Sequence, residues 1–85
     1  MGRRIGVVGI IIEKNRASVE AVNRILSENA PYILGRMGIP NREKDIQVIS
    51  LIVEIDSDHL GALTGKLGKL DGVIVKSALT TKEIS

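Results

Sequence analysis

Two long apolar runs, each followed by a segment with helical spacing, constrain what this 85-residue chain can fold into. Residues 5–12 and 46–55 are rich in isoleucine and valine, a composition that is typical of buried β-strands. Polar residues that can cap a helix follow each run, Asn15 after the first and Asp56 after the second. The chain therefore predicts two strand–helix units.

A further strand is expected after each helix. The first helix should end at residues 29–31, because the residue before Pro31 is pushed toward extended geometry. Residues 32–39 then predict a strand that pairs with residues 46–55 through a polar turn. The second helix should end near Gly72, which favours a left-handed stop, and residues 73–79 predict the last strand. The apolar stripes of the two helices are Val19, Val22, Ile25 and Leu26, and Leu60, Leu63, Leu67 and Leu70.

The order strand, helix, strand, strand, helix, strand indicates an α+β chain with a ferredoxin-like βαββαβ fold. Right-handed crossovers then give a four-stranded antiparallel sheet with both helices on one face. The length is that of one domain, so residues 1–85 are expected to form a single unit. Residues 80–85 are expected to be a loose tail.

Composition excludes several classes of site. The chain has no cysteine and one histidine, His59, so no metal site and no cofactor is expected. The net charge of +2 comes from interspersed residues, and Tyr32 is the one aromatic, so we expect no direct binding of nucleic acid. The apolar stretch at residues 5–12 is too short to cross a membrane, and we expect a cytoplasmic protein.

Both long strands are apolar on both faces, although only one face can lie under the helices. An uncovered apolar face is an aggregation hazard for a monomer, so we expect a homo-oligomer, a dimer or a tetramer. The alternative is that a bulge at Gly6 or Gly9 re-aims the side chains. The residues expected at the interface are Val8, Ile10, Ile12, Ile46, Val48 and Ile52.

Three glycines, Gly61, Gly65 and Gly68, form a stripe along the second helix beside its leucines. Glycine lowers helix stability, so the stripe suggests a need for close approach. Two explanations remain open: the two helices pack closely there, or the stripe forms a smooth wall for a ligand or a partner's backbone. Either one predicts that Gly65→Ala destabilises the protein or weakens its oligomer.

No catalytic pattern is evident. Residues 61–66 lack the spacing of a phosphate loop, and the single histidine has no nucleophile elbow to serve. Acylphosphatases share this size and topology, but their glycine-rich basic loop after the first strand is replaced by Glu13-Lys14-Asn15-Arg16. We therefore expect no enzyme, with an acylphosphatase-like hydrolase as the weakest alternative.

Arg36-Met37-Gly38-Ile39-Pro40 with Arg42-Glu43, the segment 61–68 and Gly72-Val73 together resemble a known family. Its members are small stand-alone proteins described as iron-only hydrogenase system regulators of anaerobic bacteria. The family is similar in fold to ACT domains and to the C-terminal domain of the nickel-responsive repressor. The resemblance implies an oligomeric domain that senses a small molecule or a metal. The repressor's metal site needs several histidines and a cysteine, which this chain lacks, and its DNA-binding segment has no counterpart here.

The leading hypothesis is a homo-oligomeric regulatory module that binds a small-molecule effector or a protein partner. As a transcriptional regulator, such a module would act without a DNA-binding segment of its own. The rival is a purely structural interaction module without a ligand. ACT domains commonly bind amino acids near the loop after the first strand, which corresponds to residues 13–16 although the usual glycine of that loop is absent. The expected ligand- or partner-binding residues are Asn15, Arg16, Arg36, Gly61, Gly65 and Gly68.

Overall fold

The computed structural model describes residues 2–13, 16–41 and 43–82. The elements follow the predicted order, with one short 3₁₀ turn, η1, added after the first helix. The predicted strand boundaries hold to within two residues at each end. The elements are β1 (Arg4–Glu13), α1 (Arg16–Glu28), η1 (Ala30–Tyr32), β2 (Ile33–Asn41), β3 (Ile46–Ile55), α2 (Ser57–Gly68) and β4 (Val73–Leu79).

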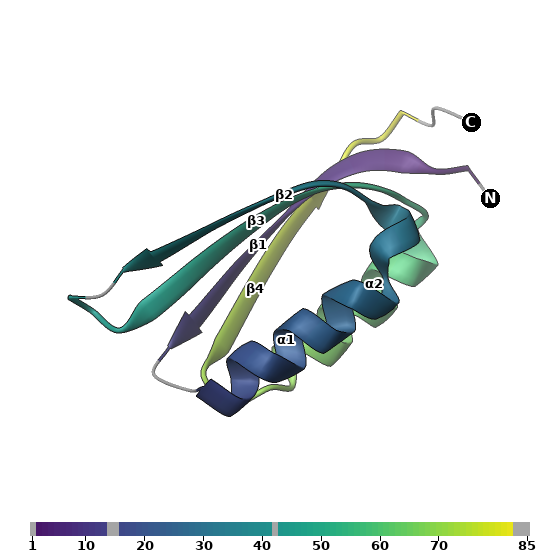
Figure 1. Cartoon of the computed structure of the whole chain (residues 1–85). Coiled ribbons are helices and arrows are strands. Elements are labelled where there is room, and N and C mark those ends of the chain that lie inside the picture. Colours follow the sequence, from purple (N-terminus) through teal and green to yellow (C-terminus); the bar gives the residue numbers. More distant parts are fainter. Residues whose placement is uncertain (1, 14–15, 42, 83–85) are drawn as a thin grey trace.

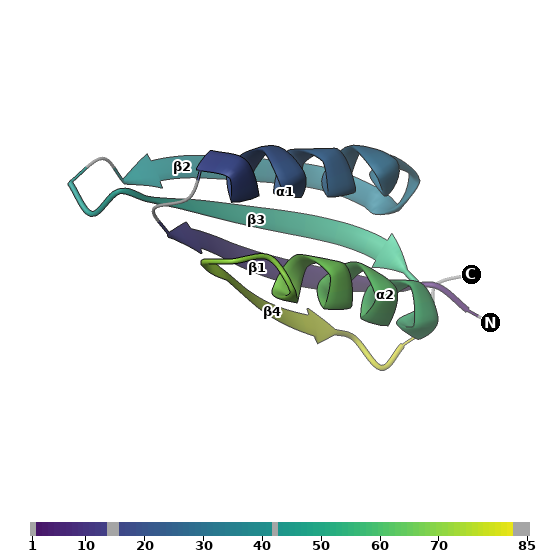
Figure 2. The ribbon, with the colours of Figure 1, turned by 90° about the horizontal axis from the view of Figure 1, so that it is seen from below.

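The four strands form one antiparallel sheet in the order β2-β3-β1-β4. Both helices lie on the same side of this sheet, with α1 below β2 and β3 and α2 below β1 and β4 (Figures 1 and 2). The β2–β3 hairpin extends beyond the helices at one end (Figure 2). This arrangement confirms the predicted ferredoxin-like fold.

The core lies between the sheet and the helices. Side chains alternate along β1, so that every second residue from Val8 to Ile12 points to the helices and is at most 2% exposed. The interface prediction was therefore wrong for Val8, Ile10 and Ile12, because these side chains fill the core of a single chain. They pack with Val22, Ile25, Leu26, Ile49, Leu51, Val53, Ile55, Leu60, Leu63, Leu67 and Val73.

A contact at Gly72 ties the ends of three elements together. Its φ of 71° is the left-handed geometry expected of this glycine, although it lies in the turn before β4, four residues after the end of α2. The Gly72 carbonyl accepts a hydrogen bond from the Glu13 N–H at 2.7 Å. The adjacent Asp71 carbonyl accepts one from the buried Ser18 hydroxyl at 2.6 Å, which fixes α1 against this turn.

The remaining expectations concern the chain ends and membranes. The Thr80 N–H donates to the Ile5 carbonyl at 3.0 Å, so the segment expected to be a loose tail begins with a residue paired to β1. Residues 83–85 lie outside the described residues. Among the described residues, no helix is long and apolar enough to span a bilayer.

Candidate functional site

The side of the sheet that faces away from the helices, here called the open face, is strongly apolar. Near its centre, one row of paired residues crosses all four strands. Each of these side chains is between 36% and 58% exposed, although all are isoleucine or valine. The row consists of Ile39, Val48, Ile11 and Ile74.

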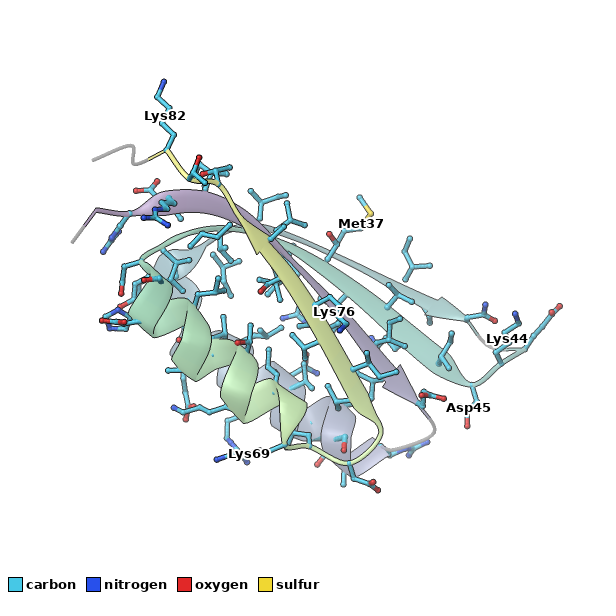
Figure 3. The ribbon with its side chains drawn as sticks, turned by 180° about the vertical axis from the view of Figure 1, so that it is seen from behind. Met37, Lys44, Asp45, Lys69, Lys76 and Lys82 are labelled. Carbon is cyan, nitrogen blue, oxygen red and sulfur yellow. The ribbon has the colours of Figure 1, made fainter. Side chains whose placement is uncertain are left out.

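Two further rows lie beside it on the open face. The row nearer the chain ends is again apolar, with Val7 45% and Ile52 42% exposed. Between the two apolar rows lies a middle row in which Gly9 carries no side chain, so the centre of the face is recessed. Met37, at one end of this middle row, points away from the helices (Figure 3). The outer row is Gly35, Ile52, Val7 and Ala78, and the middle row is Met37, Ser50, Gly9 and Lys76.

The open face includes three of the six residues predicted to form the interface, namely Ile46, Val48 and Ile52. On β1, the open-face residues are Val7 and Ile11, which the sequence reasoning missed. Alternation along β1 already separated the two sets, but it could not show which set lies under the helices. Only the pairing of Ile11 with Val48 and of Val7 with Ile52 decides that question. Whether a partner covers the open face stays a prediction.

The glycine stripe of α2 lies on the surface. Gly61, Gly65 and Gly68 are exposed, and a Cβ built at each of them meets nothing within 4 Å. The expectation that these glycines allow α1 and α2 to pack closely was therefore wrong. A role as a wall for a ligand or partner stays untested.

Gly65→Ala is now expected to stabilise the chain. The added methyl enters open space, and alanine is favoured over glycine in a helix by up to about 1 kcal/mol. The midpoint of urea denaturation should rise with an unchanged slope. A fall in the midpoint would show that a partner already occupies the stripe.

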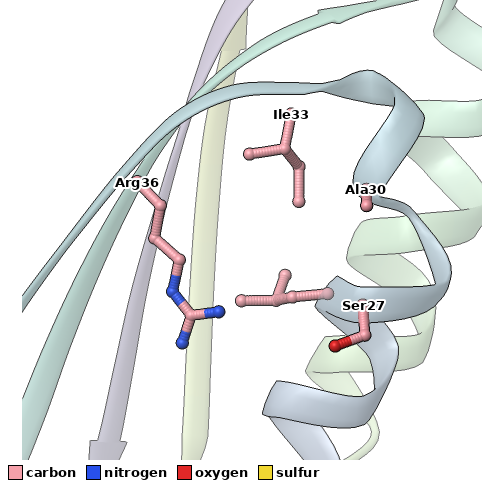
Figure 4. Close-up of a pocket in the computed structure, with 5 residues that line it drawn as sticks. Ser27, Ala30, Ile33 and Arg36 are labelled. Carbon is pink, nitrogen blue, oxygen red and sulfur yellow. The ribbon is translucent and has the colours of Figure 1, made fainter.

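Arg36 lies beside a hollow of about 240 Å³ between the end of α1 and the start of β2 (Figure 4). It pairs with Leu51 across the sheet, which places its side chain on the side of the helices. The Arg36 Nη2 donates to the Asn23 Oδ1 of α1 at 2.6 Å. Arg16 is exposed at the first residue of α1, two turns before Asn23, and Asn15 lies outside the described residues. The structure therefore does not bring the predicted binding residues together in one site.

A small polar cluster lies at the start of α2, next to η1. The Asp56 carboxylate caps α2 by accepting the His59 N–H at 3.1 Å, and it also contacts the His59 Nδ1 at 2.5 Å. The His59 ring lies 5.0 Å from the Tyr32 ring, and the Arg3 guanidinium lies 5.5 Å from that ring. Within the described ranges, no group of three potential metal ligands occurs. The backbone N–H of His59 lowers the pKa of Asp56 below its ordinary value of 3.8.

Asp56→Ala is expected to lower the melting temperature at neutral pH, because the His59 N–H loses its acceptor. The native-state pKa of Asp56 is depressed, so its stabilisation is present above pH 3.8 and disappears as the pH falls through the lowered value. Melting curves between pH 2 and pH 7 should therefore converge at the acid end. Asp56→Asn keeps an oxygen acceptor and serves as the control. Equal melting temperatures of Asp56→Ala and wild type at pH 7 would contradict the capping role.

Comparison with known proteins decides the family. Residues 4–77 match the model of the TM1266-like family, described as "Iron-only hydrogenase system regulator, putative". The chain belongs to this family. Its fold matches the structure of the uncharacterized protein TM1266 from Thermotoga maritima, with 36% sequence identity and a TM-score of 0.89, covering 91% of this chain and 96% of that one. This assignment confirms the resemblance found in the sequence.

More distant structures share the fold of the TM1266-like chain. The ACT domain of GTP pyrophosphokinase from Chlorobium tepidum is 20% identical with a TM-score of 0.72, covering 89% of this chain and 99% of that one. The C-terminal domain of MgtC from Mycobacterium tuberculosis is 14% identical with a TM-score of 0.73, covering 99% and 95%. No curated protein matched.

Proposed function

We propose that this TM1266-like protein is a non-catalytic regulatory module of the iron-only hydrogenase system that works as a homo-oligomer paired through its open face. One observation carries the proposal. An unbroken row of isoleucine and valine crosses all four strands on the side away from the helices, in a chain of a family described as regulators. Burial of that row against a partner would supply the apolar area that a small domain needs.

A second copy of the chain fits this face in size. The molecule extends 41 × 19 × 17 Å, so a broad face has a footprint on the order of 700 Å². Each partner in a standard stable interface loses about 800 Å². Pairing two open faces would therefore use about the whole of one side of each subunit.

The charge distribution also favours self-association. Within the three central rows of the open face, Lys76 is the charged side chain, and it lies on the edge strand β4. Glu13 and Glu54 lie in the rows at the two ends of the face. A lysine at an edge can extend its ammonium group to the solvent while its stem covers apolar surface. Two faces that meet over these three rows can therefore pair without burying an unpaired charge.

The regulatory role is tested in an anaerobe that encodes this chain. Deletion of the gene is expected to change the transcript levels of the hydrogenase genes, and wild-type protein should restore them. Ile11→Lys, which places a charge on the open face, should fail to restore them, whereas Gly65→Ala should succeed. Unchanged transcript levels in the deletion strain would contradict the regulatory function.

A purely structural interaction module is the competing function. The two differ in whether the native state binds an effector, because a ligand that binds only the native state raises the melting temperature. A thermal-shift screen of small metabolites therefore separates them. A reproducible shift supports the regulatory module.

A further inference from the structure

The hollow beside Arg36 combines an apolar lining with one cation. Leu26, Ala30 and Ile33 supply the apolar surface, and Ser27 and Arg36 supply the polar groups (Figure 4). The residues come from the end of α1, from η1 and from the start of β2. Apolar walls with a few convergent polar groups are the usual makeup of a small-molecule site.

The sequence of β2 explains why this space is not filled by the protein. The register is irregular between Ile33 and Gly35, so Leu34 has no partner position on β3. Beyond this irregularity, the first two positions of β2 that face the helices are Arg36, opposite Leu51, and Gly38, opposite Ile49. Arginine and glycine thus stand where the other strands place isoleucine, valine or leucine against the helices. A gap is left between β2 and the end of α1.

The guanidinium of Arg36 is available as an anion receptor. Its hydrogen bond to Asn23 uses one of the five N–H donors that an arginine carries. A planar guanidinium binds a carboxylate through two parallel hydrogen bonds, and Asn23 holds the side chain toward the hollow. Arg36 is exposed, so an anion can reach it from solvent.

The surroundings select the type of anion. Phosphate sites typically lie at helix N-termini, whereas this hollow adjoins the C-terminal end of α1, where the helix dipole disfavours a dianion. A single arginine balances one negative charge. The volume of about 240 Å³ is below the range of roughly 300–1,000 Å³ that drug-sized ligands occupy.

We propose that this hollow binds a small aliphatic monocarboxylate. Its carboxylate would pair with Arg36 and its hydrocarbon chain would lie against Leu26, Ala30 and Ile33. The site differs in place from the loop after β1, and as an effector site the inference rests on the proposed function. The site and the open face share strand β2. Gly35 and Met37, which flank Arg36 on this strand, belong to the opposite side of the sheet.

The test is a titration of ¹⁵N-labelled protein with isovalerate, followed by amide chemical shifts. Shifts are expected at residues 26–36 with a Kd in the millimolar range or tighter. The neutral analogue 3-methylbutanol should bind at least about tenfold more weakly, because it lacks the charge. Phosphate that binds as tightly as isovalerate would overturn the proposed ligand class.

Variants assign the binding to the guanidinium. Arg36→Gln should weaken isovalerate binding by at least about tenfold. Arg36→Lys keeps the positive charge but loses the planar guanidinium, so its affinity for isovalerate should lie between those of Arg36→Gln and wild type. Arg16→Gln is the matched control at the far end of α1 and should bind normally. Spectra of each variant before titration show that it is folded. No shifts for wild type, or equal shifts in Arg36→Gln, would overturn the proposal.

The two proposals fail separately. The hollow lies on the side of the helices, so isovalerate should also bind the Ile11→Lys variant, whose open face is disrupted. If the wild-type protein dimerises but does not bind isovalerate, the ligand-site proposal is contradicted and the proposed dimer is not. If the protein binds isovalerate but hydrogenase transcript levels are unchanged in the deletion strain, the regulatory function is contradicted and the ligand site is not.

Discussion

Ile11→Lys is expected to convert the protein from a dimer to a monomer at micromolar concentrations. Ile11 lies near the centre of the apolar row, and each dimer would bury two added ammonium groups without partners. The dissociation constant should rise by at least about 100-fold, which corresponds to about 2.7 kcal/mol. Sedimentation velocity measures the change directly, since one chain has a mass of 9.2 kDa.

Ala62→Lys is the matched control for this experiment. It adds the same charge at an exposed position of α2, on the side of the helices. Its sedimentation should equal that of wild type. If Ile11→Lys also sediments as wild type, or if Ala62→Lys alone dissociates, the open face is not the surface that pairs.

Gly6→Ala is expected to destabilise the fold itself. A Cβ at this position would lie 2.9 Å from the Ala78 carbonyl oxygen and 2.9 Å from the Leu79 Cδ1. The carbonyl belongs to the backbone of β4, so the strand itself must move to admit the methyl group. Overpacking of this kind costs about 1–3 kcal/mol.

Gly9→Ala, on the same strand, separates this clash from a general effect of glycine. The nearest atom to its Cβ is the Lys76 carbonyl oxygen at 3.9 Å, an ordinary contact. Both substitutions are compared in the Ile11→Lys background, so that dimerisation does not contribute to the unfolding free energy. Urea denaturation should show a large loss for Gly6→Ala and a small change for Gly9→Ala. Equal midpoints would contradict the close approach of β1 and β4.

The fold could be predicted because its signals are local. The apolar runs at residues 5–12 and 46–55, the leucine stripe of α2 and the cap at Asp56 each specify one element without reference to the rest of the chain. The topology then follows from general rules on crossovers. The positive φ of Gly72 was likewise predicted, although as a helix stop, whereas the glycine lies in the turn before β4.

The candidate site was harder to predict because it depends on pairing between distant segments. Two alternating sets of apolar residues on β1 are equivalent in sequence, and only the register against β3 assigns Val8 to the core and Val7 to the open face. The glycine stripe misled for a related reason. Because glycine lowers helix stability, the stripe suggested a close packing contact. Gly65 instead faces solvent, and a Cβ built there meets no other atom of its own chain within 4 Å. The hollow at Arg36 arises from an irregularity after Ile33, which leaves no mark in the residue pattern.

The distance between spin labels in the dimer tests the central claim most directly. The chain has no cysteine, so Met37→Cys and Lys76→Cys each give one labelling site, at the two edges of the middle row. Sheets packed face to face are about 10 Å apart, and each edge strand lies about 7 Å from the midline of a four-stranded sheet. Pairing through the open face therefore predicts separations below roughly 25 Å at both sites. Pairing through one sheet edge would keep only one of the two distances short. Pairing through the helices would make both distances exceed roughly 30 Å, because each subunit is at least 17 Å thick. Either of these results would contradict the account.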